Sequence, residues 1–358
     1  MARPPSDRVN LTDIAERLGL SISTVSRSLR GLSGIHPETE AKIAAVAQEM
    51  GYGLDAKPQK ASRSSNTGLR HILVLAQSDA SQINQGYLAG ISEAAMALNA
   101  AILTHLVPLE RCSQLTEERY LPPSLRGGLV QGVVLFHRWP TEVVKSLSKR
   151  LPVVSLIHEY PGTPVDVVGL DDRRGVADLV GHLYAAGHRR IGFFGFCPEV
   201  SWSRARFAAY VEALAMYGLP YDPRWVVQID LARALSPQPF PTAEAGATVL
   251  QLLGEQVDAW IGASSRTASS LHNDLLAQGL RVPEDVALTS YHGARPSPAD
   301  TGLPPFTTTA VSDEELGAAA LHRLINRLDN LRESRRTILL PAPLVVGAST
   351  RPLPIGAA

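Results

Sequence analysis

The chain has 358 residues, of which 45% are hydrophobic and 19% are charged. At roughly 150 residues per domain, this length predicts about two to three folding units and excludes a single small domain. The composition is too apolar for a mostly disordered chain. Lysine plus arginine and aspartate plus glutamate each total 34, so the chain has no net charge that would attract nucleic acid or a membrane.

The charge is unevenly distributed along the chain. Residues 1–70 contain ten basic and seven acidic side chains, a balance of +3, which leaves −3 on the remainder. A basic head on an acidic body hints at contact with nucleic acid through the N-terminal region.

The cysteine content and the N-terminus predict where in the cell the protein is found. Two cysteines, Cys112 and Cys197, are too few for a disulfide framework or a zinc site with four cysteines, so we expect buried free thiols. The N-terminus lacks an apolar signal core, and no uncharged apolar run approaches the roughly 18 residues of a membrane-spanning helix. We therefore expect a cytoplasmic protein with no membrane partner.

Three short helices are predicted in the head. They run from Leu11 to Leu18, from Ser21 to Gly31 and from Pro37 to Gly51. Thr12 or Asn10 can cap the first helix, Ser21 can cap the second, and Pro37 suits a first helical position. Gly19 stops the first helix, so a turn of three residues joins it to the second.

The second helix has the residues needed to read DNA. Its outward face carries Ile22, Ser23, Ser26, Arg27 and Arg30. Short hydroxyls and guanidinium groups on a protruding helix can contact base edges in the major groove. The alternative is a solvated, serine-rich helix on a three-helix cap.

Residues 53–70 are poor in large apolar groups and rich in Ser, Lys and Arg, which predicts a linker. Beyond it, apolar strands alternate with helices. The expected strands are His71–Ala76, Gly132–Phe136, Val153–Ile157, Val165–Gly169, Arg190–Phe196, Trp225–Ile229, Ala259–Ala263 and Val286–Ser290. The expected helices include Gly86–Leu98, Arg173–Ala186, Arg204–Tyr217, Ala243–Leu253 and Thr267–Gln278. This alternation predicts parallel sheets wound on both faces, and about 280 residues suffice for two α/β lobes.

The head contains the run LTDIAERLGLSISTVSRSL at residues 11–29, PET at 37–39 and GY at 51–52. With these residues it closely resembles the headpiece of the lac repressor family of bacterial transcription regulators. Further landmarks follow in the family's order: VGLD at 168–171, GHRRI at 187–191, RAR at 204–206, GLP at 218–220, GLRVPEDV at 279–286, PFTT at 305–308 and LP at 340–341. The resemblance therefore covers essentially the whole chain.

The family resemblance implies a homodimer that binds a near-palindromic operator. It implies a helix-turn-helix headpiece (residues 1–52), a hinge or linker (53–70), and a core of two periplasmic-binding-protein-like lobes for effector binding and dimerisation (71–358). The residues expected to contact DNA are Thr12, Ser21, Ile22, Ser23, Thr24, Ser26, Arg27, Arg30, Lys57 and Lys60. By this resemblance Ile22 and Ser23 tune base preference, and Arg30 stands where the family commonly has Asn.

The hinge departs from the family. On DNA, the family folds this segment into a short helix that pushes a leucine into the minor groove. The corresponding stretch here is 55–61, in which Pro58 would cost roughly 3 kcal/mol inside a helix and Ala61 takes the place of leucine. We therefore expect a poorly formed hinge helix, an operator bent less than usual, and mainly phosphate contacts from Lys57, Lys60 and Arg63.

The effector site is expected where the strands end. In open parallel sheets, ligands bind beyond the carboxyl ends of the strands. The residues predicted to bind the effector are Ser81, Arg138, His158, Trp202, Arg206, Ser264, Ser265 and His292. Among these, Arg206 matches the family's effector-binding arginine.

Polar residues that usually accept hydrogen bonds from sugar hydroxyls are missing from this site. The family usually has Asn-Pro-Phe where this chain has Ser81-Gln82-Ile83, and Asn-Asp where it has Ser264-Ser265. A pair of Asp residues in the family is replaced here by His292-Gly293. The crowding of Arg138, His158, Arg206 and His292 then favours an anionic sugar derivative over a neutral sugar. The alternative is that these groups pair with acids such as Glu159 and Asp171.

Two other classes of protein fit the sequence less well. An enzyme is disfavoured because the chain has no G-x-S-x-G, G-x-G-x-x-G, P-loop, H-E-x-x-H or paired-cysteine zinc motif, and we expect no catalytic residue, metal or cofactor. A solute-binding or sensor protein of the periplasmic type would account for two lobes, but not for the DNA-binding head.

Overall fold

A computed structural model of the chain describes residues 11–29, 36–50, 68–78, 82–236, 243–255, 257–292 and 305–351. The chain divides into two compact units, Met1–Ser65 and Asn66–Ala358. The residues expected to form the hinge helix, together with Arg30, Lys57 and Lys60, lie outside the described ranges.

The head contains the three expected helices, α1 (Leu11–Leu18), α2 (Ile22–Leu29) and α3 (Pro37–Glu49). They enclose a small core made of Ile14, Ala15, Val25, Ile43 and Ala47. Ser21 caps α2, because its hydroxyl accepts a hydrogen bond from Thr24 N at 3.1 Å. Gly19 adopts φ +63°, a left-handed conformation that ends α1 and that glycine adopts without strain.

The first lobe of the core is built on a six-stranded sheet in the order β11-β5-β4-β3-β1-β2, in which all neighbouring strands are parallel. Its strands are β1 (Arg70–Gln77), β2 (Ala100–Val107), β3 (Gly132–Leu135), β4 (Val153–Leu156), β5 (Asp166–Leu170) and β11 (Thr337–Leu340). Alternate residues of β1 face opposite sides: Ile72 and Val74 pack in one core cluster, Leu73 and Leu75 in another. The lobe therefore buries both faces of its sheet.

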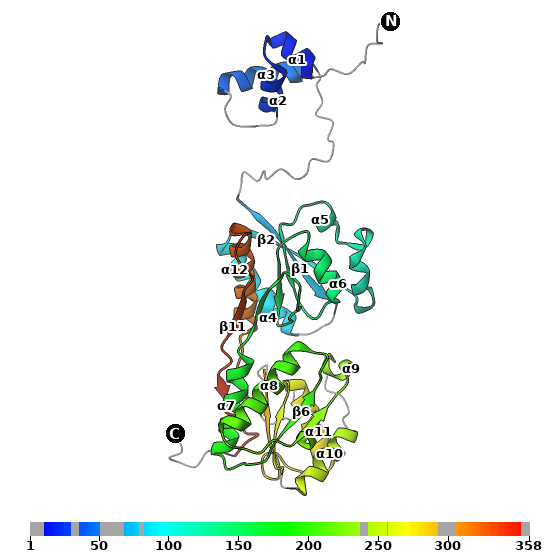
Figure 1. The fold of residues 1–358 in the computed structure, drawn as a ribbon, viewed down its shortest axis with the longest axis vertical. Helices are drawn as coiled ribbons and strands as arrows, with labels where there is room; N and C mark the ends of the chain where they lie inside the picture. Colours follow the sequence, from blue (N-terminus) through cyan, green and yellow to red (C-terminus); the bar gives the residue numbers. More distant parts are fainter. Residues whose placement is uncertain are drawn as a thin grey trace. The chain divides into compact units, whose positions relative to one another are not determined.

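Helices cover these two faces. The helical elements of the first lobe are α4 (Gln82–Ala97), η1 (Leu109–Thr116), η2 (Glu118–Tyr120), α5 (Pro123–Arg126), α6 (Thr141–Ser148) and α12 (Asp313–Asp329). Side chains of α4 and α12 pack on one face, and those of η1, α5 and α6 pack on the other. Figure 1 shows α4 and α12 side by side against the sheet.

The second lobe repeats this three-layer architecture. Its six-stranded sheet has the order β12-β10-β9-β8-β6-β7. The strands are β6 (Ile191–Phe196), β7 (Val226–Gln228), β8 (Ala259–Gly262), β9 (Ala287–Ser290), β10 (Thr307–Thr309) and β12 (Leu344–Val345). The helical elements are α7 (Asp172–Ala185), α8 (Ser201–Met216), η3 (Pro223–Trp225), α9 (Leu231–Ala234), α10 (Ala243–Leu253) and α11 (Ser265–Ala277). Side chains of α7 and α8 pack on one face and those of α10 and α11 on the other.

The expected fold class is confirmed, with corrections in detail. Every expected strand is present within one or two residues, but β2, β10, β11 and β12 were not predicted. The short strand β12 pairs antiparallel with β10, so the second sheet is not wholly parallel. The chain crosses between lobes after β5, after β10 and after β11, so neither lobe is one continuous segment.

Glycines allow α4 and α12 to approach closely. A Cβ added at Gly90 would lie 1.8 Å from the carbonyl oxygen of Glu314, and one at Gly317 would lie 2.1 Å from that of Tyr87. At Gly86, the added atom would lie 2.5 Å from Cβ of Asp313. These contacts bring the two helices together without intervening side chains.

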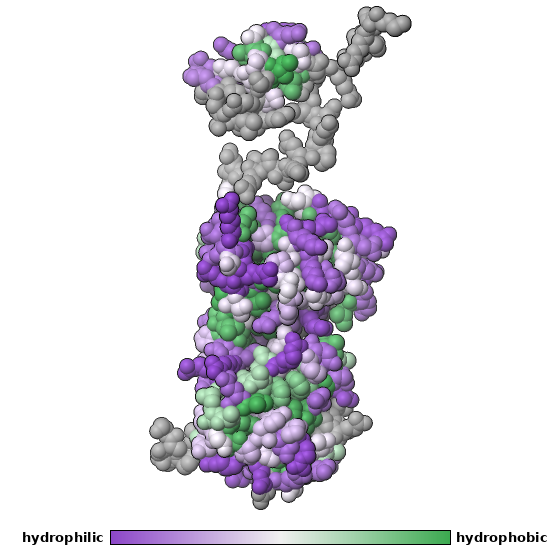
Figure 2. All heavy atoms as spheres, viewed as in Figure 1, coloured by the Kyte–Doolittle hydropathy of each residue, from purple (hydrophilic) through white to green (hydrophobic). Residues whose placement is uncertain are grey.

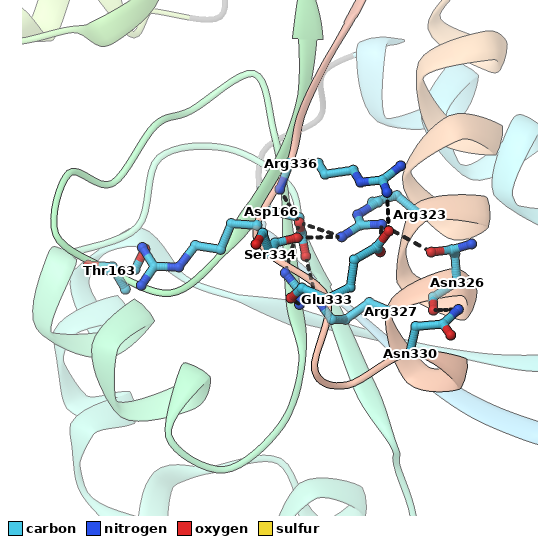
Figure 3. A network of polar contacts seen from close by, with 10 residues as sticks. Thr163, Asp166, Arg323, Asn326, Arg327, Asn330, Glu333, Ser334 and Arg336 are labelled. Atoms are coloured by element: carbon cyan, nitrogen blue, oxygen red, sulfur yellow. Dashed lines mark hydrogen bonds and ion pairs between the residues drawn. The ribbon is translucent and has the colours of Figure 1, made fainter.

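A buried ion-pair network fixes the far end of α12 (Figure 3). Asp166 at the start of β5 accepts from Arg323 Nη2 at 3.0 Å, from Arg327 Nε at 2.8 Å and from the backbone N–H of Arg336 at 2.7 Å. Burial would raise the pKa of Asp166, but these hydrogen bonds outweigh it and lower that pKa. The network joins β5, α12 and the chain entering β11.

Apolar side chains also remain at the surface of the core. Met96 on α4 is 81% exposed and Leu106 on the edge strand β2 is 55% exposed. On the face drawn in Figure 2, hydrophobic residues gather on the second lobe and hydrophilic residues predominate on the first. Both cysteines are buried and free, as expected.

Candidate functional site

A cavity of about 270 Å³ lies between the two lobes, at the carboxyl ends of their strands. Its lining comes from the segments that follow β1, β3, β4, β8 and β9, and from α4, η1, α8 and α11. The lining residues are Gln77, Ser78, Tyr87, Leu109, His137, Arg138, Leu156, Ile157, His158, Trp202, Arg206, Leu235, Ser264, Ser265, Arg266 and His292. The position agrees with the rule for ligand sites in open α/β sheets.

Seven of the eight residues predicted to bind an effector line this cavity, and Ser81 lies outside the described ranges. Tyr87 and Leu235 were not predicted, because neither directly follows a strand, and Leu109 was not predicted, because β2, which ends two residues before it, was not predicted. Trp139, which does follow β3, turns away: it is 2% exposed, and its Nε1 donates to the carbonyl of Phe136. The position of a residue directly after a strand therefore predicts many, but not all, of the residues that line the cavity.

Arg206 is the most tightly held of these residues. Its Nε donates to Asp172 Oδ1 at 3.0 Å, and its Nη1 donates to the carbonyl oxygen of Ala263 at 2.8 Å. Its guanidinium carbon also lies 4.7 Å from the ring centre of Trp202 and 4.1 Å from that of Tyr291. The acid that pairs with Arg206 is Asp172, rather than the neighbouring Asp171, which caps α7.

Three lining residues have strained backbones. His137, Ile157 and His292 adopt φ values of +64°, +66° and +54°, a region that costs a non-glycine residue about 1–3 kcal/mol. Each stands just beyond the end of a strand. Such strain persists only where the surrounding structure enforces it, and it is typical of functional sites.

The histidines of the cavity have different surroundings. His292 Nε2 lies 3.3 Å from Oδ1 of Asp313, the first residue of α12. His158 is 8% exposed, and its Nδ1 has no hydrogen-bond partner in the part of the chain that the structure describes. Burial, together with the positive charge near His137, Arg138 and Arg206, lowers the pKa of His158 to about 3. His158 is therefore neutral at physiological pH.

The start of α11 faces the same cavity. Ser264 is its N-cap: the Ser264 hydroxyl accepts from Thr267 N at 3.2 Å, and Thr267 Oγ1 accepts from Ser264 N at 2.8 Å. This capping box leaves Ser265 and Arg266 in the first turn, at the positive end of the helix dipole.

In the head, all but one of the described residues predicted to contact DNA lie on or beside α2. Ile22, Ser23, Thr24, Ser26 and Arg27 belong to this helix, and Ile22 is 49% exposed. Ser21 caps α2. Thr12 is an exposed residue of α1 rather than its cap.

Within the described ranges, no group of three or more His, Cys, Asp or Glu side chains could hold a metal ion. The helices of the same ranges include none that is long and apolar enough to cross a bilayer.

The chain matches two family descriptions. Residues 10–53 match "Bacterial regulatory proteins, lacI family", and residues 180–350 match "Periplasmic binding protein-like domain". The chain belongs to the lacI family of bacterial regulatory proteins. The resemblance noted in the sequence is thereby confirmed.

Relatives align with this lacI-family chain over almost its whole length. The transcriptional repressor CytR of Escherichia coli K12 is 25% identical and covers 99% of each chain. The regulator DegA of Bacillus subtilis is 26% identical over 97% of this chain and 99% of its own. AglR of Rhizobium meliloti is 28% identical over 97% of this chain and 95% of its own.

Solved structures share the fold. A complex of the regulator CelR with cellobiose has a TM-score of 0.63 and 23% identity, and covers 96% of this chain and 100% of its own. The lac repressor dimer bound to operator and the anti-inducer ONPF has a TM-score of 0.62 and 22% identity, and covers 96% of this chain and 99% of its own. This lacI-family member is a DNA-binding transcription regulator whose core has an effector-binding fold.

Proposed function

We propose that this regulator is a cytoplasmic repressor that binds a near-palindromic operator as a homodimer and changes its affinity for DNA when its core lobes close on a small molecule. The observation that carries the proposal is a cavity formed by both lobes, lined by Arg206 and six other predicted residues, in a chain that also has a helix-turn-helix head. A ligand that binds the closed lobes more tightly shifts the population toward that state.

A homodimer follows from the way in which one head reads DNA. A single α2 contacts too few base pairs for specificity, whereas two related by a twofold axis read a palindrome. The exposed Met96 and the edge strand β2 with Leu106 offer apolar surface that a second copy can cover. One relative of the same fold is named as a dimer bound to operator.

In this proposal the protein acts by binding and not by catalysis. Its matched family consists of regulators, and its sequence lacks the common catalytic motifs. A solute-binding protein of the periplasmic type would have the two lobes, but this alternative does not account for the head formed by α1, α2 and α3.

Selection of genomic DNA by the purified full chain, followed by footprinting, tests the proposal. We expect a protected site with two symmetric halves, and weaker binding by Arg27→Ala of about 1–3 kcal/mol at fixed salt. Arg17→Ala is the matched control, because Arg17 on α1 pairs with Glu49 of α3 at 2.8 Å and does not belong to α2. Failure of the chain to select any sequence, or equal affinity of the Arg27 variant with the head still folded, would contradict it.

A further inference from the structure

The lining of the cavity between the lobes is rich in basic side chains. It includes three arginines, Arg138, Arg206 and Arg266, and three histidines, and none of the described residues that line it is Asp or Glu. Neutral sugars are usually held by carboxylates that accept hydrogen bonds from their hydroxyls. The charge of this cavity favours a ligand of a different class.

The acids behind the lining are already engaged. Asp172 pairs with Arg206, and Asp313 lies within 3.3 Å of the His292 ring. Side-chain exposures of 14% for Asp172 and 20% for Asp313 show that both carboxylates are largely covered. Asp172 therefore balances the charge of Arg206 within the protein. The pair of Arg206 and Asp172 does not attract an anion.

Arg138 differs from Arg206 in this respect. Its side chain lines the cavity, is exposed, and makes no hydrogen bond or ion pair with any residue in the described ranges. Its backbone is held in place, because its carbonyl accepts from Gln77 Nε2 at 2.6 Å. The nearby acid is the exposed Glu199, whose carboxylate accepts from the Cys197 thiol at 3.1 Å. Arg138 therefore presents a positive charge that is not neutralised by direct contact.

The second lobe presents positive charge from the other side of the cavity. Ser265 and Arg266 form the first turn of the 13-residue helix α11, whose N-terminal dipole favours an anion. The Ser264 hydroxyl is occupied by the capping box, so the group that this turn offers to the cavity is its backbone.

A buried polar side chain also points to a ligand. His158 is more than nine-tenths buried in the lining and has an unsatisfied Nδ1 among the described residues. Burying such a nitrogen without a hydrogen bond is unfavourable, and a ligand hydroxyl or acid group would supply the missing partner.

The size of the cavity limits the ligand. Small-molecule sites commonly occupy about 300–1,000 Å³, and this cavity of about 270 Å³ lies at the lower limit. A single sugar ring with one charged substituent suits such a volume.

We propose that the effector is an anion of the size of one sugar ring, a sugar carrying a carboxylate or a phosphate, whose charged group is bound by Arg138 of the first lobe and by the first turn of α11 of the second. Because both lobes contribute, the anion stabilises the closed core. This inference rests on the effector function proposed above.

Isothermal titration calorimetry with the purified full chain tests the inference. The probes are glucose, galactose, mannose and ribose, each beside its sugar acid and its phosphate ester. We expect one acid or phosphate to bind about 10- to 100-fold more tightly than its neutral parent. Comparison of the acid with the phosphate identifies the charged group.

Variants locate the anion. Arg138→Gln should weaken binding of the best anion by about tenfold or more, while Arg138→Lys should restore part of the affinity. Arg126→Gln, which removes an exposed arginine of α5 outside the lining, is the matched control and should bind as the wild type does. Circular dichroism and thermal melting of all variants show whether they are folded.

Several outcomes would overturn the inference: tight binding of a neutral sugar alone, no binding by any anion of the panel, or an anion whose affinity does not change in Arg138→Gln. Operator binding is measured with the same protein preparations. This measurement shows whether only the anionic effector is wrong or whether the proposed DNA-binding function is wrong as well. A chain that selects DNA and responds to a neutral sugar keeps the function and loses the anionic effector.

Discussion

The Nε of Arg206 on α8 donates to Oδ1 of Asp172, the first residue of α7, at 3.0 Å, and Arg206 lines the cavity between the lobes. The side chains are 4% and 14% exposed, so water screens the two charges weakly. The pair holds the starts of α7 and α8 together, where the chain enters the second lobe after β5.

Asp172→Asn should destabilise the core by about 3 kcal/mol, because it leaves the buried guanidinium of Arg206 without its counter-charge. Denaturant unfolding of the full chain measures the change. Asp178→Asn on the same helix is the control, since its contact with Arg174 spans 4.0 Å between exposed side chains and should contribute less than about 1 kcal/mol. Equal stability of the two variants would show that the buried pair is unimportant.

The contact between α4 and α12 gives a second prediction. Gly90→Ala would place a methyl group 1.8 Å from the Glu314 carbonyl, so the helices must separate. We expect a loss of about 3 kcal/mol or more in the free energy of unfolding, measured by the same denaturant experiment. Ser92→Ala, at an exposed position of α4, should change stability by less than about 0.5 kcal/mol. A Gly90 variant as stable as the wild type would rule out the close approach of these helices.

The buried His158 predicts how stability depends on pH. Its pKa is about 3 in the folded protein, against about 6.5 for an exposed histidine. Between these values the unfolded chain binds a proton that the folded chain does not, so stability falls as pH decreases below about 6.5, by at most about 1.4 kcal/mol per pH unit from this group.

Denaturant midpoints at pH 7.5 and at pH 5.0 check this effect. The loss of stability between the two pH values should be smaller in His158→Gln than in the wild type. Some loss should remain, because burial also lowers the pKa values of His182 and His272. His322→Gln, at an exposed position of α12, should behave like the wild type. An unchanged pH dependence in His158→Gln would contradict the prediction.

The hinge prediction concerns residues outside the described ranges and rests on the sequence. In the double variant, Pro58→Ala supplies a residue that an interior helical turn accepts, and Ala61→Leu supplies an apolar side chain that can enter the minor groove. We expect it to bend the operator more than the wild type does, as measured by energy transfer between dyes at the two ends of the DNA. Ser64→Ala in the same linker serves as a control. A wild-type complex already bent as sharply as that of the double variant would refute the prediction.

The sequence alone determined the elements whose signals are local. Ser21 and Gly19 mark the boundaries of α2 and α1 because capping and left-handed turns depend on neighbouring residues only. Buried runs such as Ile72–Ala76 identify strands for the same reason, and the rule that ligands bind beyond strand ends located most of the cavity lining.

The tertiary structure decided what depends on contacts between distant segments. The sequence suggested Glu159 or Asp171 as a partner for the cationic residues, but the crossing of the chain between lobes brings Asp172 to Arg206 and Asp313 to His292. Leu109 and Leu235 meet at one cavity although 126 positions separate them in the sequence. Such pairings depend on how the two sheets are connected and packed, and no local pattern of residue types encodes that arrangement.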